Sequence, residues 1–115
     1  MKTASFFSYS GPGRISIARY ASRGLQGYRT YKALAPRQDM LRMPYDEYRT
    51  EYFKILSDLD PAQVAEDLAA LAAPHEPILL CWERPPLTEK NWCHRTMVAQ
   101  WLERSLGMRV PEIKS

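Results

Sequence analysis

The side chains best suited to chemistry gather in one stretch of the chain, residues 81 to 95. A thiol can act as a nucleophile, a redox group or a metal ligand, and a carboxylate can act as an acid or a base. A guanidinium can bind a carboxylate or a phosphate. We therefore expect the working site of this protein to use residues from the following set: Cys81, Glu83, Arg84, Cys93, His94 and Arg95.

Cys93 has the most chemical promise, because it stands where a helix is predicted to begin. The free N–H groups and the dipole of a helix N-terminus favour a thiolate, and the neighbouring His94 and Arg95 act in the same direction. This setting would suit Cys93 as a nucleophile, as a redox-active thiol or as a metal ligand. A thiol that is merely packed at a helix start is the alternative. We name Cys93, Glu83 and His94 as the catalytic candidates.

Glu83 is a candidate acid or base if it is partly buried. Its alternative role is an ion pair with Arg84, Arg95 or Lys90. His94 could also be a surface residue at the start of the helix. The ligand-binding candidates share a place near the same junction or a positive charge that could meet an anion, and they are Arg19, Arg23, Cys81, Arg84 and Arg95.

Several known site patterns are absent. Cys81 lies in an apolar run, which is typical of a core residue. Cys81, Cys93 and His94 lack a C-x₂-C pair and a fourth ligand, so we expect no metal and no cofactor. No cysteine is followed by five residues and an arginine, as a phosphatase loop would need. The stretch from Gly11 to Arg14 lacks the lysine and the spacing of a Walker loop.

The elements that must position these residues can be read from periodicity and from turn signals. Apolar runs or alternation predict strands over Ala4–Tyr9, Arg14–Arg19, Pro77–Trp82 and Met108–Ile113. Apolar residues at spacings of three and four predict helices over Pro44–Leu59, from Pro61 to the residues before Pro74, and over Cys93–Leu106. Between residues 20 and 43 no period is clean, and we expect a long loop with at most a turn of helix.

This order of elements predicts an α/β fold, with a small mixed or mainly parallel sheet flanked by helices in a single layered domain over residues 1–115. The first two strands are separated only by Ser10–Gly13, which is too short for a parallel crossover. The two strands are therefore either antiparallel or not neighbours in the sheet. The reactive stretch lies where a central strand ends, which is where α/β sheets bind ligands.

Charge is distributed unevenly along the chain. Residues 1–43 hold eight basic residues and one acidic residue, for a net charge of +7, and the remainder carries −4. A basic half favours an anionic partner, which could be a small molecule, a nucleotide or a nucleic acid. A nucleic acid would be met by the basic and aromatic residues of the loop over residues 27–42, namely Tyr28, Arg29, Tyr31, Lys32, Arg37 and Arg42. A solvated surface balanced by acids from the other half explains the charge equally well.

The first ten residues lack the apolar run of a signal peptide or a membrane span. We therefore expect a cytoplasmic protein with no membrane partner and with both thiols free. The sequence does not indicate an oligomeric state.

The sequence also resembles a known family. The segments ISIARYASRG, YKALAPRQDML, ILLCWERP and WCHRTMVAQWL resemble the domain of unknown function 488 family over nearly the whole chain. The family's hallmark is a strand ending in L-C-x-E, followed by a loop and by C-H-R at a helix start, here Cys81, Glu83, Cys93, His94 and Arg95. The resemblance implies a small α/β fold in a cytosolic microbial or phage protein, and it implies no established activity. Many members have a helix between the first two strands, which this chain lacks.

Three functions remain open. The first is a pocket for an anionic small molecule, such as a nucleotide or nucleoside. The second is an enzyme that acts on a nucleotide or a nucleic-acid base through Cys93 or Glu83. The third is a nucleic-acid-binding accessory protein that uses the loop over residues 27–42.

Overall fold

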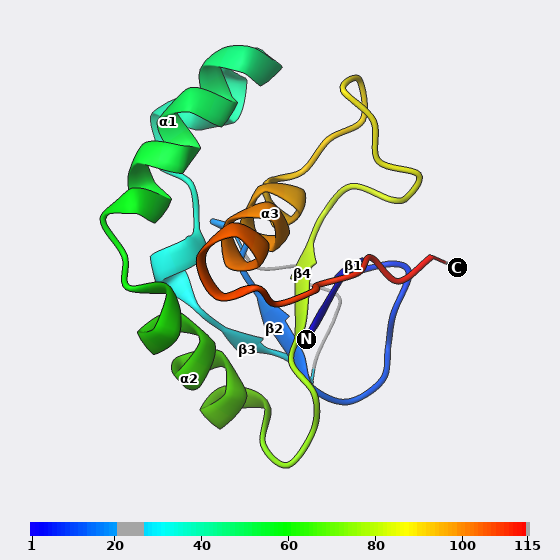
Figure 1. Cartoon of the computed structure of the whole chain (residues 1–115). Coiled ribbons are helices and arrows are strands. Elements are labelled where there is room, and N and C mark those ends of the chain that lie inside the picture. The colour runs from blue at the N-terminus through cyan, green and yellow to red at the C-terminus, as the bar shows by residue number, and fades with distance from the viewer. Residues whose placement is uncertain (21–26, 115) are drawn as a thin grey trace.

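A computed structural model describes residues 1–20 and 27–114 of the chain, so Arg23 lies outside the described residues. Within these described residues the fold has four strands and three α-helices, which confirms the predicted α/β class (Figure 1). The strands are β1 (Lys2–Ser5), β2 (Arg14–Ser16), β3 (Arg29–Thr30) and β4 (Ile78–Cys81). The helices are α1 (Tyr45–Ser57), α2 (Pro61–Ala72) and α3 (His94–Leu106), and two short 3₁₀ helices cover Lys32–Leu34 and Gln38–Arg42.

The sheet is parallel throughout and has the order β1-β4-β2-β3. The apolar strand β4 lies between β1 and β2, in register with Lys2 on one side and Arg14 on the other at its first residue, Ile78. The first two strands are therefore not neighbours, which settles the choice that the short Ser10–Gly13 connection left open. The connection passes the start of β4, where the carbonyl of Gly13 accepts a 2.8 Å hydrogen bond from the Ile78 amide.

Local sequence signals explain the ends of the helices. The Asp60 carboxylate caps α2 by accepting hydrogen bonds from the amides of Ala62 and Gln63, and Pro61 occupies the first turn. Helix α3 ends at Gly107, whose φ of 68° is the left-handed conformation that glycine adopts without cost. Cys93 is the N-cap residue of α3, but its side chain makes no capping hydrogen bond.

Two clusters of buried side chains hold the sheet. Apolar residues from all three helices pack with Ile15, Ile17 and Leu79 in the larger cluster. The smaller cluster contains Ala4 and Leu80 from the strands and is closed by residues outside the helices. Both cysteines belong to the smaller cluster, so β4 and the start of α3 meet at its edge.

Some predicted boundaries were wrong. Strand β1 ends at Ser5 because residues 5–8 form a turn, in which the Ser8 amide donates to the Ser5 carbonyl at 3.1 Å. The predicted last strand is reduced to a single parallel bridge between Thr3 and Glu112. The loop after β2 contains β3 and both 3₁₀ helices. Among the described residues, no helix has the length and apolar character needed to cross a membrane.

Candidate functional site

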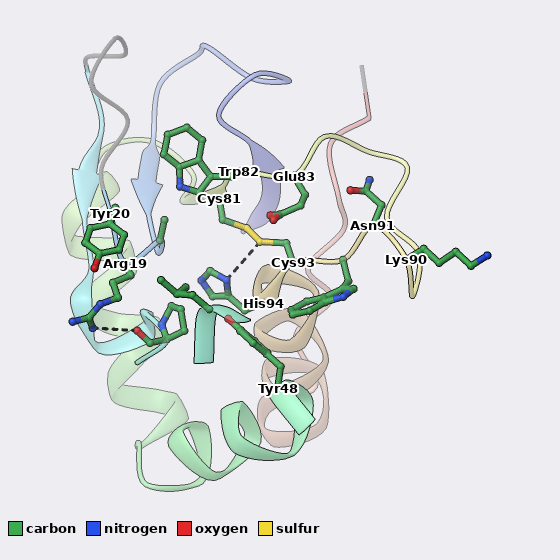
Figure 2. A pocket seen from close by; sticks show the side chains of 14 residues that line it. Arg19, Tyr20, Tyr48, Cys81, Trp82, Glu83, Lys90, Asn91, Cys93 and His94 are labelled. Atoms are coloured by element: carbon green, nitrogen blue, oxygen red, sulfur yellow. Dashed lines mark hydrogen bonds between the residues drawn. A yellow bond between two sulfur atoms is a disulfide. The ribbon is translucent and has the colours of Figure 1, made fainter. Parts of the chain in front are cut away.

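A pocket of about 410 Å³ opens at the carboxyl ends of β2 and β4, beside the start of α3 (Figure 2). This is the edge at which parallel sheets bind ligands. Most of the predicted site residues that the structure describes line the pocket, namely Arg19, Cys81, Glu83, Cys93 and His94. The strand–loop–helix order thus brings together side chains that are far apart in the sequence.

The two cysteines are joined by a disulfide, with their Cα atoms 7.0 Å apart. The prediction that both thiols are free was wrong for this structure. The loop over residues 82–92 returns the chain from the end of β4 to the start of α3, and this return places the two sulfurs side by side. Both cysteines are almost fully buried, at 1% exposure for Cys81 and 4% for Cys93.

His94 is buried and held in one orientation. Its Nε2 lies 2.7 Å from the carbonyl oxygen of Ile17, so Nε2 carries a proton and donates it. The other ring nitrogen, Nδ1, lies 3.5 Å from the Cys93 sulfur with its lone pair available. Burial, with a smaller contribution from the Arg95 charge, lowers the pKa of His94 to about 4. The imidazole is therefore neutral at physiological pH, and it faces the disulfide as an acceptor.

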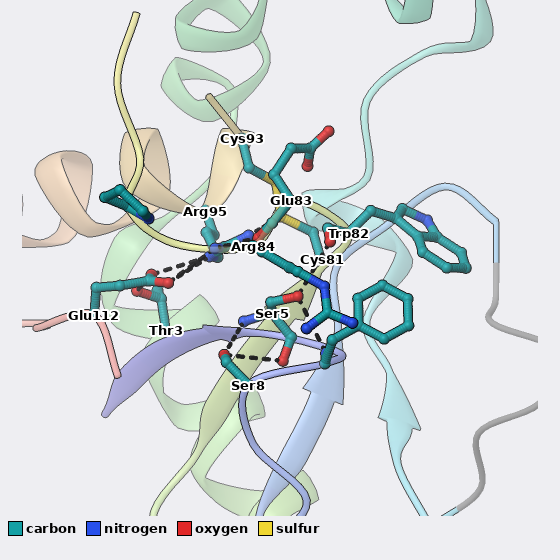
Figure 3. Close-up of polar contacts among 12 residues, drawn as sticks. Thr3, Ser5, Ser8, Cys81, Trp82, Glu83, Arg84, Cys93, Arg95 and Glu112 are labelled. Atoms are coloured by element: carbon teal, nitrogen blue, oxygen red, sulfur yellow. Dashed lines mark hydrogen bonds and ion pairs between the residues drawn. A yellow bond between two sulfur atoms is a disulfide. The ribbon is translucent and has the colours of Figure 1, made fainter. Parts of the chain in front are cut away.

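Arg95, which we expected to bind a ligand, lies behind the disulfide and is fully buried. Its guanidinium makes an ion pair with Glu112, with Nη2 2.8 Å from Oε2, and donates to the Glu83 carbonyl at 2.7 Å (Figure 3). Its Nη1 donates to the Cys81 sulfur at 3.1 Å. Arg95 does not line the pocket, and these three partners engage all three nitrogens of its guanidinium, so it is not presented to an anion there.

The tail after α3 positions this arginine. The Thr3 amide donates to the Pro111 carbonyl and the Ile113 amide donates to the Thr3 carbonyl, which fixes the tail along β1. The Thr3 hydroxyl also donates to the Glu112 carboxylate at 2.6 Å. Nothing in the local sequence around Glu112 predicted this role, because the contact joins residues 17 positions apart.

Glu83 is partly exposed and lines the pocket. Its carboxylate makes no hydrogen bond or ion pair with another residue that the structure describes, so the predicted ion pair with Arg84, Arg95 or Lys90 is not seen there. Burial raises the pKa of Tyr48, and the Glu83 charge raises it further. The Glu83 carboxylate is therefore near enough to the Tyr48 hydroxyl for its charge to disfavour ionisation of that hydroxyl.

The remaining arginines differ in their positions. Arg19 lines the pocket, and its Nε is buried without a hydrogen-bond partner in the described part of the chain. Its Nη1 reaches the Pro36 carbonyl at 3.4 Å. Arg84 is exposed outside the pocket, with its guanidinium 4.7 Å from the centre of the Phe7 ring. The structure therefore separates Arg84 from the other ligand-binding candidates.

Aromatic side chains form much of the pocket, and none of them was among the predicted site residues. Tyr20 and Trp82 are exposed on its walls at 53% and 39%, and Tyr48 is buried beneath. Trp92 contributes a further half-buried ring, with its centroid 4.6 Å from that of Tyr48. The position of Trp82 directly after Cys81 was the available signal, because side chains that leave the end of a strand border the site.

The Sγ atoms of Cys81 and Cys93 and the Nδ1 of His94 lie within 4.8 Å of one another. Two thiolates and an imidazole are a donor set that zinc accepts. With the sulfurs bonded to each other, only His94 remains as an unmodified ligand. The disulfide form is therefore not arranged to hold zinc through this set.

A comparison with protein families matches residues 15–102 to the model described as domain of unknown function DUF488. The chain belongs to the DUF488 family. This confirms the resemblance that the sequence segments indicated. No curated protein and no solved structure matched the chain. All residues that line the pocket of this DUF488 protein fall inside the matched range, whereas Glu112 and Thr3, which hold Arg95, lie outside it.

Proposed function

We propose that the pocket of this DUF488 protein binds a small organic anion with a planar aromatic part, such as a nucleotide or a nucleoside. The observation that carries the proposal is the combination of exposed aromatic rings with Arg19 in one cavity at the carboxyl edge of the sheet. Small-molecule sites typically have volumes of about 300–1,000 Å³ and apolar walls with few polar groups. The cavity of about 410 Å³ is within that range.

Each part of such a ligand has a partner of matching chemistry. An aromatic base would stack on Tyr20 or Trp82, because rings of this kind contribute binding energy through stacking. A phosphate or carboxylate would meet the guanidinium of Arg19, which lines the pocket. Lys90 also borders the pocket, but its chain extends away from the cysteines (Figure 2). Arg19 is therefore the cation that the proposal depends on.

Binding can be measured by calorimetry with three probes, which are a nucleoside monophosphate, the matching nucleoside and inorganic phosphate. The expected order of affinity is monophosphate, then nucleoside, then phosphate, because only the first engages both the rings and Arg19. Arg19→Ala should reduce the affinity for the monophosphate by about tenfold, the value of a charge-assisted hydrogen bond, and should leave the affinity for the nucleoside unchanged.

The matched control is Arg109→Ala, which removes the same charge at an exposed position. This variant should bind like the parent protein. Equal loss in both variants would mean that the general positive charge, not the pocket, attracts the ligand. Failure of all three probes to bind would overturn the proposal.

A second candidate function is an enzyme that acts on the same ligand, and the state of Glu83 favours it. Its carboxylate faces the pocket and is not used by another described residue, which is what a general acid or base needs. Glu83→Gln would then abolish turnover of a nucleotide while preserving its affinity. Turnover that is unaffected by Glu83→Gln would exclude this role.

A further inference from the structure

The disulfide beside the pocket has an asymmetric setting. The Cys81 sulfur accepts a 3.1 Å hydrogen bond from the Arg95 guanidinium, whereas the Cys93 sulfur faces the neutral Nδ1 of His94 at 3.5 Å. A guanidinium stabilises a thiolate, and a neutral imidazole nitrogen accepts a hydrogen bond from a thiol. The site therefore offers a separate form of stabilisation to each sulfur after reduction.

We propose that Cys81 and Cys93 form a redox-active pair that exchanges with small-molecule thiols entering through the pocket. This inference goes beyond the proposed ligand function and does not depend on it. A disulfide is easily reduced when its reduced form is stabilised, and a good leaving thiolate accelerates the exchange. The Arg95 contact supplies both effects at Cys81.

The exchange can be written with its atoms balanced. A thiolate RS⁻ attacks the sulfur of Cys93, which is the slightly more exposed residue of the two, and forms the mixed disulfide RS–S(Cys93). The bond between the two protein sulfurs breaks, and its electron pair leaves on Cys81 as a thiolate beside Arg95. A second RS⁻ attacks the sulfur of the bound RS group, releases RSSR and leaves the Cys93 thiolate. One proton then makes the Cys93 thiol, which donates to Nδ1 of His94.

In this reaction the protein disulfide is reduced and two small thiols are oxidised to one disulfide. The small thiol must be narrow enough for the pocket, because both sulfurs are buried from the remaining surface. Among the described residues, the charged and titratable groups around the pair include Arg95 and His94 on α3, Glu83 on the loop and Glu112 behind Arg95. Helix α1 adds Tyr48, which lines the pocket, and Tyr52, whose ring packs on His94. Glu112 balances the charge of Arg95, so the effect on Cys81 depends on the direct contact with Nη1.

Single-cysteine variants test the asymmetry. The rate of alkylation by iodoacetamide, followed against pH, gives the thiol pKa in Cys93→Ser, where Cys81 remains, and in Cys81→Ser, where Cys93 remains. We expect Cys81 to titrate at least about one unit below the free value of about 8.5, and Cys93 to titrate at or above that value. Equal values, or a Cys81 value at or above 8.5, would overturn the proposal.

The unmodified protein supplies a second test that needs no variant. Incubation with excess glutathione, followed by acid quenching and mass spectrometry, should show loss of the disulfide and a transient adduct on Cys93. A bulky thiol, such as a cysteine-containing protein, should react far more slowly than glutathione, because it cannot enter the pocket. A disulfide that persists in glutathione until the protein is denatured would contradict the inference, as would equal rates for both reductants. Binding of a nucleotide does not enter either test, so the outcome is separate from that of the proposed ligand function.

Discussion

At the scale of single residues, Arg95 is the most constrained side chain of the site. Its guanidinium is fully buried and is shared among the Glu112 carboxylate, the Glu83 carbonyl and the Cys81 sulfur. Taking one member out of a buried ion pair leaves the other charge without compensation, which costs far more than losing a surface pair. Arg95 therefore links the strand end, the pocket loop and the tail.

Arg95→Met should lower the free energy of unfolding by about 3–5 kcal/mol, since it leaves Glu112 unpaired. Arg109→Met, at an exposed position on the same tail, should change it by less than about 0.5 kcal/mol. Urea denaturation of both variants in the same redox state measures the difference. A loss below about 1 kcal/mol for Arg95→Met would mean that Arg95 is not a structural ion-pair partner.

His94 gives the stability a pH dependence. Its pKa is about 4 in the folded protein and 6.5 when unperturbed, so between these values the unfolded chain holds a proton that the folded protein lacks. The contribution of neutral His94 to the free energy of unfolding is complete above pH 6.5. It is lost as the pH falls towards 4, by about 3 kcal/mol in total. Urea denaturation of the disulfide form across this range measures the slope.

His94→Gln should flatten this slope, because the substituted side chain does not titrate. His75→Gln is the matched control, since His75 is exposed in the loop before β4 and should leave the slope intact. A slope that survives His94→Gln would have to come from carboxylates instead.

At the scale of the elements, the helices were predictable and the sheet was less so. Helices α1, α2 and α3 follow from apolar spacing and from local signals such as Asp60, Pro61 and Gly107, which act within a few residues. The strand β4 was also clear, because its continuous apolar run is typical of a buried parallel strand. The strand order depends on contacts between distant segments, which periodicity does not encode.

The same distinction applies to the site. The reactive residues could be located from the expected strand end and helix start. The disulfide, the burial of Arg95 and the role of Glu112 could not, because each depends on how the loop over residues 82–92 and the tail return to β4. Exposed rings such as Trp82 were missed because aromatic residues are usually assigned to the core.

The N-cap of α2 provides a test at this scale. Asp60→Ala removes the acceptor for the amides of Ala62 and Gln63 and should lower the free energy of unfolding by about 1 kcal/mol. Asp58→Ala removes the same charge two residues earlier, at an exposed position, and should cost less than Asp60→Ala. Thermal and urea denaturation measure both. Equal effects would show that charge, not capping, is responsible.

Gly13 provides a second test, because it lies in the connection between β1 and β2 at the point where that connection passes the start of β4. Its φ is 84°, and a Cβ there would collide with the Glu76 carbonyl oxygen. Gly13→Ala should destabilise the protein by about 3 kcal/mol or more, since backbone strain adds to displacement of the loop before β4. Gly107→Ala meets open space and should cost only about 1–2 kcal/mol. A comparable loss of unfolding free energy in both variants would show that the collision at Gly13 adds nothing to the cost of its backbone conformation.

At the scale of the whole molecule, the loop over residues 27–42 does not present its aromatic rings as an open stacking surface. In the loop over residues 27–42, the Tyr28 ring packs on Phe6 and the Tyr31 hydroxyl donates to Asp67. Arg37 is paired with Asp39 and Glu51. The rings and part of the charge that a nucleic acid would need are therefore engaged within the protein.

We expect a single-stranded oligonucleotide to bind only weakly, through Arg29 and Arg42, and to dissociate between about 50 and 200 mM salt as phosphate contacts are screened. Fluorescence anisotropy at several salt concentrations measures this. Binding that persists at high salt, and that Arg29→Gln with Arg42→Gln removes, would restore the nucleic-acid function as the leading candidate.

The insertion of β4 between β1 and β2 also affects how the protein can be synthesised. Strands β1 and β2 leave the ribosome before β4, which is the hydrogen-bonding partner of both and begins at Ile78. Until then β1 and β2 present unpaired strand edges beside apolar side chains, a combination that promotes aggregation. The sheet of a nascent chain therefore cannot form until β4 has been synthesised. A fragment that ends before Ile78 should need a chaperone to stay in solution.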